Sequence, residues 1–216
     1  GVAGQADPYE QGGLVVFLSS IPPGLPAPVG AGTANPIRLT VVPGSYDTTS
    51  DHEYDANYND SIISGAGADV IYGQQGNDTI DSGADNDTVD GGIGDDVITG
   101  GAGLDRLLGD AGDDTINGGA EADYVDGGLG NDLILGGAGR DNLIGGEGND
   151  TIDGGTDQPG DHDTAVFSET TSALSIFLDA GGNATVTSGA DTDTLISIES
   201  LVGGSSDDTF TGSSRN

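Results

Sequence analysis

The chain of 216 residues contains no cysteine, no methionine and no tryptophan, and its only Lys or Arg side chains are four arginines. Against these stand 31 Asp and 6 Glu, so the net charge is −33. Without cysteine the chain has no disulfide, no thiolate metal site and no thiol nucleophile. Proteins that bind nucleic acids or anionic membranes do so largely through cations, so both classes are excluded.

Long apolar runs are also missing. No stretch of 18 apolar residues occurs, so no membrane-spanning helix is predicted and we expect no membrane insertion. The chain opens at Gly1 without a signal peptide, and we expect it to be an excerpt of a longer protein or a processed product.

Glycine, by contrast, is abundant, with 41 residues. It does not occupy every third position and there are only 8 prolines, which excludes collagen. High net charge with 33% hydrophobic residues is typical of disordered chains. The even spacing of the aspartates argues against disorder, because a solvated acidic tail needs no such spacing.

Aspartates recur every nine residues without a gap. A branched aliphatic residue follows two positions after each one, and a glycine-rich stretch precedes it. Residues 64–153 form ten uninterrupted nonapeptides of the pattern G-G-x-G-x-D-x-U-x, in which U is Ile, Leu or Val. We call these aspartates the ladder: Asp60, Asp69, Asp78, Asp87, Asp96, Asp105, Asp114, Asp123, Asp132, Asp141 and Asp150.

Each nonapeptide predicts a loop followed by a short strand. Glycine clusters interrupt regular structure, so the first six positions form a loop, and x-U-x is a minimal strand with U on one face. Two units complete one turn of a flattened coil. The predicted fold is all-β: a flattened β-solenoid with two nonapeptides per turn and short flanking β segments as caps. Its inner columns are Ile80, Ile98, Ile116, Ile134, Ile152 and Ile71, Val89, Leu107, Val125, Leu143.

The repeat region repels itself. Residues 55–163 carry 25 carboxylates against two arginines, and about eleven aliphatic residues make a thin core. A hard divalent cation would neutralise the charge and join neighbouring loops, because Ca²⁺ takes six to eight oxygens from carboxylates and carbonyls. The sequence therefore predicts one Ca²⁺ between stacked loops. Mg²⁺ is disfavoured because it prefers a small octahedral shell.

This pattern closely resembles the repeats-in-toxin (RTX) family, also called haemolysin-type calcium-binding repeats. The resemblance covers residues 64–153, and more loosely 55–163 and 203–212. It implies a parallel β-roll with Ca²⁺ along both edges. Each ion would take the second and fourth carbonyls and the Asp of one loop. The loop 18 residues later would add its first and third carbonyls and its own Asp.

For this chain, the resemblance implies about eight complete sites between loops. The two ends of the roll could add about two more, which gives about eight to ten ions. One site combines Gly101, Gly103 and Asp105 with Gly118, Ala120 and Asp123. The implied ligands are the ladder aspartates and Asp163, with the first-position carbonyls of Ser82, Gly91, Gly100, Gly109, Gly118, Gly127, Gly136 and Gly145. The other carbonyls are those of Gly65, Gly92, Gly101, Gly119 and Gly128 (second), Ala84, Ile93, Ala102, Ala111, Ala120, Leu129, Ala138 and Glu147 (third), and Gly67, Gly76, Gly94, Gly103, Gly112 and Gly130 (fourth).

Some loops depart from the pattern. Carbonyls survive such changes, so we expect ligation to persist at a higher cost in backbone geometry. The departures are Ser64 and Ser82 at the first position, Gln74 and Asp110 at the second, and Asp85 and Glu121 at the fourth.

Three segments follow from these patterns. Residues 1–54 are an N-terminal cap or linker with strand-like runs at 14–19 and 37–42, residues 55–167 are the β-roll, and residues 168–216 hold a C-terminal hairpin and partial repeats. The step from Asp150 to Asp163 is 13 residues rather than nine, so we expect the roll to end there. Asp193 is expected to lie outside the regular ladder.

Catalytic motifs do not stand out. The two histidines, His52 and His162, are far apart in sequence, and we expect His162 to be solvated. We therefore expect no enzyme and no catalytic residues. The predicted function is a Ca²⁺-binding roll that folds outside the cell, as a structural and secretion module of a type I-secreted bacterial adhesin or surface protein. Such a module is secreted or lies on the cell surface.

Two other functions stay open. One is a polysaccharide-binding accessory module of a secreted enzyme such as a mannuronan epimerase, and the other is an ice-binding roll. Within the repeats, only Arg106 and Arg140 could bind an acidic sugar through a positive charge. Ice binding needs a flat, regular array of Thr or Asn side chains, and the outward columns of this chain are irregular. Besides calcium ions, a surface glycan or neighbouring domains of the same chain are the partners considered. The sequence does not predict an oligomeric state.

Overall fold

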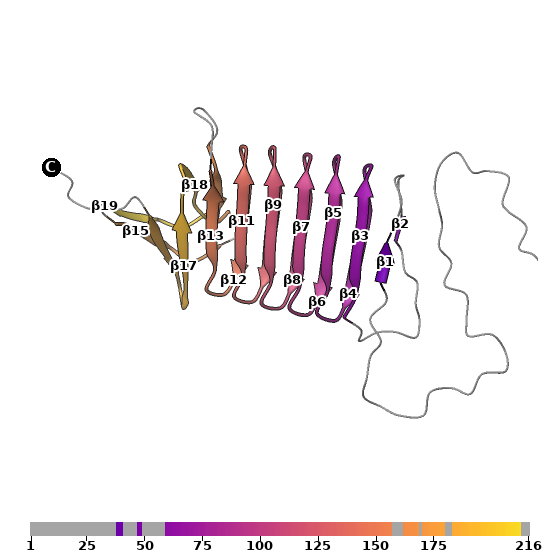
Figure 1. The fold of residues 1–216 in the computed structure, drawn as a ribbon. Helices are drawn as coiled ribbons and strands as arrows, with labels where there is room; N and C mark the ends of the chain where they lie inside the picture. Colours follow the sequence, from indigo (N-terminus) through magenta and orange to yellow (C-terminus); the bar gives the residue numbers. More distant parts are fainter. Residues whose placement is uncertain are drawn as a thin grey trace, which may run out of the picture.

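The computed structural model describes residues 38–40, 47–48, 59–156, 162–168, 170–179 and 183–212. Its centre is a coil of parallel strands in two facing sheets, and Figure 1 shows the strands of one sheet side by side. Successive strands alternate between the sheets, and each pairs with the strand 18 residues later, as in Ile98↔Ile116. This confirms the predicted parallel β-roll with two nonapeptides per turn.

One sheet has eleven strands in the order β1-β3-β5-β7-β9-β11-β13-β17-β16-β15-β19, and the other has eight in the order β18-β14-β12-β10-β8-β6-β4-β2. The strands are β1 Arg38–Thr40, β2 Asp47–Thr48, β3 Ser61–Ala66, β4 Val70–Gln75, β5 Thr79–Ala84, β6 Thr88–Ile93, β7 Val97–Ala102, β8 Arg106–Ala111, β9 Thr115–Ala120 and β10 Tyr124–Leu129. They continue with β11 Leu133–Ala138, β12 Asn142–Glu147, β13 Thr151–Gly155, β14 Thr164–Val166, β15 Leu174–Leu178, β16 Ala184–Ser188, β17 Asp191–Ile196, β18 Ser200–Val202 and β19 Thr209–Gly212.

The core is a double column of aliphatic side chains between the sheets. Each U residue of the nonapeptides from Ile71 to Ile152 has an exposed fraction of at most 1%, and the flanking strand positions point outward. Both predicted columns are therefore confirmed. The columns continue into the C-terminal segment through Ala165 and Leu195.

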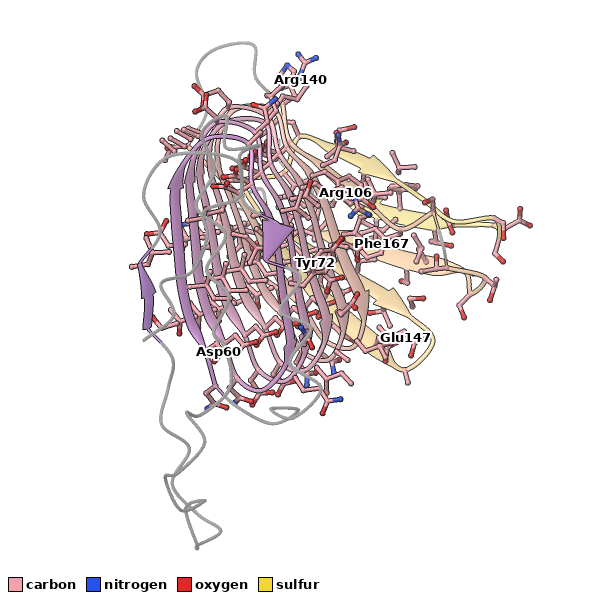
Figure 2. All side chains as sticks on the ribbon, turned by 90° about the vertical axis from the view of Figure 1, so that its right-hand side faces the viewer. Asp60, Tyr72, Arg106, Arg140, Glu147 and Phe167 are labelled. Carbon is pink, nitrogen blue, oxygen red and sulfur yellow. The ribbon has the colours of Figure 1, made fainter. Side chains whose placement is uncertain are left out.

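The loops form two edges. Edge 1 follows the strands of the eleven-stranded sheet and holds the loops 64–69, 82–87, 100–105, 118–123 and 136–141. Edge 2 follows the strands of the eight-stranded sheet and holds the loops 73–78, 91–96, 109–114, 127–132 and 145–150. Figure 2 looks along the coil and shows Arg140 of edge 1 at one end of its outline, with Asp60 and Glu147 of edge 2 at the other.

The roll does not end near Asp163, and that expectation is wrong. β13 pairs in parallel with β17, and β14 pairs in parallel with β18, which adds a further turn. The chain leaves the roll after β14, forms the predicted hairpin from β15 and β16, and returns through β17. The limits of the three sequence segments stay a prediction.

At the other end, β1 pairs with β3 and β2 with β4, so each sheet gains one short parallel strand before the repeats. β1 lies within the predicted strand-like run 37–42, whereas the run 14–19 is outside the described residues. Within the described part of the chain, no helix has the length and apolar character needed to cross a membrane.

Candidate calcium sites at the edges of the roll

The ladder aspartates are buried in the loops and bonded to one another's backbones. From Asp69 to Asp150 each has an exposed fraction of 3% or less. The backbone N–H of Asp105 donates to Oδ1 of Asp123 at 2.9 Å, and the same bond recurs between neighbouring turns at 2.7 to 2.9 Å. Stacking 18 residues apart therefore places each carboxylate directly against the backbone of the aspartate one turn earlier.

In eight of the ladder aspartates, the second carboxylate oxygen is buried and accepts no hydrogen bond from the described residues. An unsatisfied buried polar atom costs about 1–3 kcal/mol, and more when it is charged. A repeated cost of this kind along both edges indicates that a cation belongs beside these oxygens. Within the described segments, the oxygens concerned are Oδ2 of Asp78, Asp87, Asp96, Asp105, Asp114, Asp123, Asp132 and Asp150.

The first loop position shows where these oxygens point. A Cβ added to Gly118 would lie 2.6 Å from Oδ2 of Asp123 and 2.6 Å from the carbonyl oxygen of Gly136. At Gly100 the corresponding oxygens, those of Asp105 and Gly118, are also 2.6 Å away. The carboxylate oxygen of one turn and the first carbonyl of the next turn thus lie around the same small space, which a side chain would fill.

Other loop carbonyls turn toward the same gap. A Cβ added to Gly101 would strike the carbonyl oxygen of Gly83, so second-position carbonyls face the following turn. Third-position carbonyls face the preceding turn, as when the N–H of Gly112 donates to the carbonyl of Leu129 at 2.8 Å. Carboxylates and carbonyls from both loops converge between turns, and this donor set fits Ca²⁺. Which of them bind each ion stays a prediction.

Burial governs the electrostatics of the ladder. Burial, together with the charges of neighbouring carboxylates, raises the pKa of Asp96, Asp123 and Asp132 to about 7, against the lowering effect of the backbone hydrogen bond. The same first cause raises the pKa of Asp78, Asp87 and Asp114 to about 6. Without a bound cation, the folded roll therefore disfavours the ionised ladder.

Where another residue replaces a loop glycine, the backbone keeps the same path, and at some positions this requires a strained, positive φ. Second-position glycines in edge 2, such as Gly92, have φ near +104°, whereas Gln74 and Asp110 have φ of 77° and 70°. Side chains with a Cβ rarely adopt such values, so these loops are strained, as expected. Ser64 and Ser82 adapt differently, since their hydroxyls donate to the first carbonyl of the next turn at 2.6 and 2.9 Å.

The two edges differ at the fifth loop position. In edge 2, Asn77, Asn131 and Asn149 each donate a backbone N–H to a side-chain oxygen of the preceding turn at 2.9, 2.7 and 3.1 Å. Asp113 does the same toward Asp95 at 3.0 Å. In edge 1 the backbone N–H of Leu104 donates the corresponding bond to Oδ1 of Asn86, at 3.0 Å. Edge 2 therefore carries a second, solvent-exposed ladder.

Sequence reasoning missed two acidic residues that continue the main ladder. The N–H of Asp150 donates to Oδ1 of Asp193 at 3.0 Å, and the N–H of Asp163 donates to Oε2 of Glu199 at 3.0 Å. Asp193 therefore lies in the ladder, and the contrary expectation is wrong. The sequence held one signal, the D-x-U spacing of Asp193 and Leu195, but nothing marked Glu199.

Outside the ladder, a site could form from a group of metal-binding side chains or in the cavity beside His162. Among the described residues, no group of three or more His, Asp or Glu side chains is placed to hold a metal ion. A shallow cavity of about 400 Å³ is lined by Arg140, His162, Thr164, Glu199 and Ser200. His162 is exposed, as expected for a solvated imidazole.

The stacked turns and paired carboxylate ladders define a parallel β-roll with cation sites built between its turns. A family model described as RTX calcium-binding nonapeptide repeat matches four times, at residues 54–89, 90–125, 99–134 and 126–158. Over this region the chain belongs to the RTX family, whose repeats bind Ca²⁺. No curated protein matches the chain.

Proposed function

We propose that the protein is a structural module which binds about eight to ten Ca²⁺ ions along its two edges and folds because of them. The observation that carries this is the row of buried, unpaired Oδ2 atoms, several of which, such as those of Asp105 and Asp123, face the same small space as a carbonyl of the next turn. Each ion would be held by the second and fourth carbonyls and Asp of one loop, and by the first and third carbonyls and Asp of the loop one turn later.

RTX repeats are typical of secreted bacterial proteins and are typically structural rather than catalytic. The chain is accordingly a non-enzymatic module that stays unfolded where Ca²⁺ is scarce and folds outside the cell. That behaviour suits passage through a type I secretion channel, and a bacterial adhesin or surface protein is the parent we favour. The chain has 37 acidic and four basic side chains, and this charge supports folding outside the cell, because external cations would offset the repulsion between carboxylates.

Calorimetric titration of the metal-free protein tests the proposal. We expect about eight to ten ions per chain, with binding coupled to a gain of β structure. Anomalous density from calcium-loaded crystals would locate the ions between turns. Two ions or fewer would end this account.

A polysaccharide-binding role is the second candidate. Arg106 on β8 lies 5.3 Å from the ring centroid of Tyr124 on β10, and this cation–aromatic pair is on an outward face. Such a pair suits an acidic sugar, but the surrounding carboxylates disfavour one. Binding of an alginate oligosaccharide that Arg106→Ala abolishes would support this role, and no binding at millimolar ligand would dismiss it.

An ice-binding role has less support. The outward column of the eleven-stranded sheet interrupts its threonines with Val97 and Leu133, which are 45% and 38% exposed. A regular hydroxyl array is therefore missing from that face. A thermal-hysteresis assay is expected to show no activity.

A further inference from the structure

The calcium ladder of edge 2 does not stop where the nonapeptides stop. The matched repeats end at residue 158, and Asp150 is the last ladder aspartate of edge 2 within them. The next turn at this edge comes from β17, 43 residues farther along the chain. β17 returns from the β15–β16 hairpin, so it reaches the edge by a route unlike that of any repeat.

Three contacts that define a turn boundary within the repeats recur here. The N–H of Asp150 donates to Asp193 Oδ1 at 3.0 Å, where Asp132 donates to Asp150 at 2.9 Å. The N–H of Thr194 donates to the Asp150 carbonyl at 2.8 Å, the same length as the bond from Thr151 to Asp132. The N–H of Thr192 donates to Asn149 Oδ1 at 2.9 Å, which continues the outer ladder.

The boundary also holds an unsatisfied acceptor. Asp150 has an exposed fraction of 2%, and its Oδ2 accepts no hydrogen bond from the described residues. Asp193 is 3% exposed, so both carboxylates of this boundary are buried. A third, Asp191, lies at the start of the same strand, and its charge adds to the burial that raises the pKa of both residues.

We propose that Asp150 and Asp193 hold a Ca²⁺ ion that lies beyond the nonapeptide repeats and fastens the returning strand β17 to the roll. The inference rests on the proposed function, because it extends the same chemistry. Gly146 and Gly148 occupy the loop positions whose carbonyls face the following turn elsewhere in edge 2, as that of Gly130 faces Gly148. They are the carbonyl ligands that the roll contributes.

The first loop position at this boundary resembles one within the repeats. A Cβ added to Gly145 would lie closest to Oδ2 of Asp150, as one added to Gly91 would lie closest to Oδ2 of Asp96. The Asp150 carboxylate is therefore aimed into the same small space as its counterparts in the repeats.

Asp193→Asn tests the inference in the full chain, with Asp81→Asn as the charge-matched control. Asp81 lies on β5 and is exposed, so its loss removes one negative charge outside the edges. We expect Asp193→Asn to bind one ion fewer than the wild type and to lose hydrogen-exchange protection in β16 and β17. Asp81→Asn keeps the full number of ions and the protection.

The possible failures are distinct. If the wild type binds the full set of ions and Asp193→Asn binds the same number with unchanged exchange, this inference is overturned and the proposed function stands. If the wild type binds no calcium, the proposed function itself fails. Should Asp193→Asn not fold, calcium-loaded wild-type crystals decide: anomalous density between Asp150 and Asp193 supports the site, and its absence overturns it.

Discussion

At the scale of single residues, the position in the loop decides whether a side chain strains the backbone and lowers the free energy of unfolding. Gln74 and Gln75 are adjacent and both exposed, but only Gln74 has a left-handed backbone, with φ of 77°. A left-handed conformation costs a residue with a Cβ roughly 1–2 kcal/mol, and glycine avoids this cost while losing more entropy on folding, about 0.5–1 kcal/mol. The two neighbours therefore respond to the same substitution with opposite sign.

We predict that Gln74→Gly stabilises the calcium-loaded protein by about 0.5–1 kcal/mol, whereas Gln75→Gly destabilises it by a similar amount. Urea unfolding at saturating Ca²⁺ measures both. Equal losses of stability in the two variants would show that the strain assigned to the second position is absent.

The ladder aspartates also set a pH dependence. Their pKa in the metal-free fold is raised, to about 7 for Asp96, Asp123 and Asp132, above the ordinary value of 3.8. A raised carboxyl pKa means that the folded state binds protons more tightly than the unfolded state does. The associated stability is fully present below about pH 4 and is lost as pH rises through 6 to 7.

Protein freed of metal on a chelating resin is therefore expected to gain β structure as the pH is lowered from 8 to 4.5. Far-UV circular dichroism measures this gain. Calcium affinity moves the other way, falling over the same interval because the ion competes with protons for the carboxylates. A metal-free β signal that is as strong at pH 8 as at pH 4.5 would contradict the assigned burial.

Much of the site could be predicted from single residues, because the nine-residue spacing alone places each Asp, each U residue and each turn. Asp193 and Glu199 could not be placed, since the first follows a hairpin and the second replaces Asp in a shortened loop. The D-x-U spacing marks Asp193 and Leu195 as a repeat fragment, but the place of Asp193 in the ladder depends on the long-range pairing of β17, and that of Glu199 on the pairing of β18.

Among the elements, the two edges of the roll are stabilised to different degrees without metal. The fifth-position ladder of edge 2 links consecutive turns through side chains that bond directly to backbone N–H groups. Asn131 takes part in bonds on both sides, to Asp113 and from Asn149, at 3.0 and 3.1 Å. Asn86 in edge 1 accepts one such bond, from Leu104.

Asn131→Ala is predicted to destabilise the calcium-loaded roll by about 1 kcal/mol, and Asn86→Ala by about half as much, since exposed hydrogen bonds contribute modestly. Chemical denaturation gives both values, and hydrogen exchange should place the loss for Asn131→Ala in edge 2. A larger effect for Asn86→Ala would refute the difference between the edges.

The fold of these elements could be predicted as far as the nonapeptides extend. The columns of Ile, Val and Leu are regular and support the two-unit turn, and the resemblance to RTX repeats implies the parallel roll. The prediction that the roll ends at the irregular step to Asp163 is wrong, because an insertion in one loop does not by itself end the stacking of turns. In the structure, Asp163 remains in register, since the N–H of Asp141 donates to its Oδ1 at 2.8 Å across a 22-residue step.

At the level of the whole molecule, charge and chain entropy oppose folding together. The net charge is −33, and folding buries ladder carboxylates whose charges repel those of neighbouring turns, as Asp105 and Asp141 act on Asp123. Eight Ca²⁺ ions would reduce this charge to about −17. Each interior loop lies between two other turns, so the first ions order loops that later ions use, and binding and folding are expected to be cooperative.

The most direct test is far-UV circular dichroism of the metal-free protein at neutral pH during titration with Ca²⁺. We predict a largely disordered spectrum without metal and a steep, cooperative gain of β structure as Ca²⁺ reaches about the millimolar range. The same concentration of Mg²⁺ should leave the chain mostly unfolded. A full β spectrum with a cooperative thermal melt in the absence of Ca²⁺ would contradict the claim that calcium folds this protein.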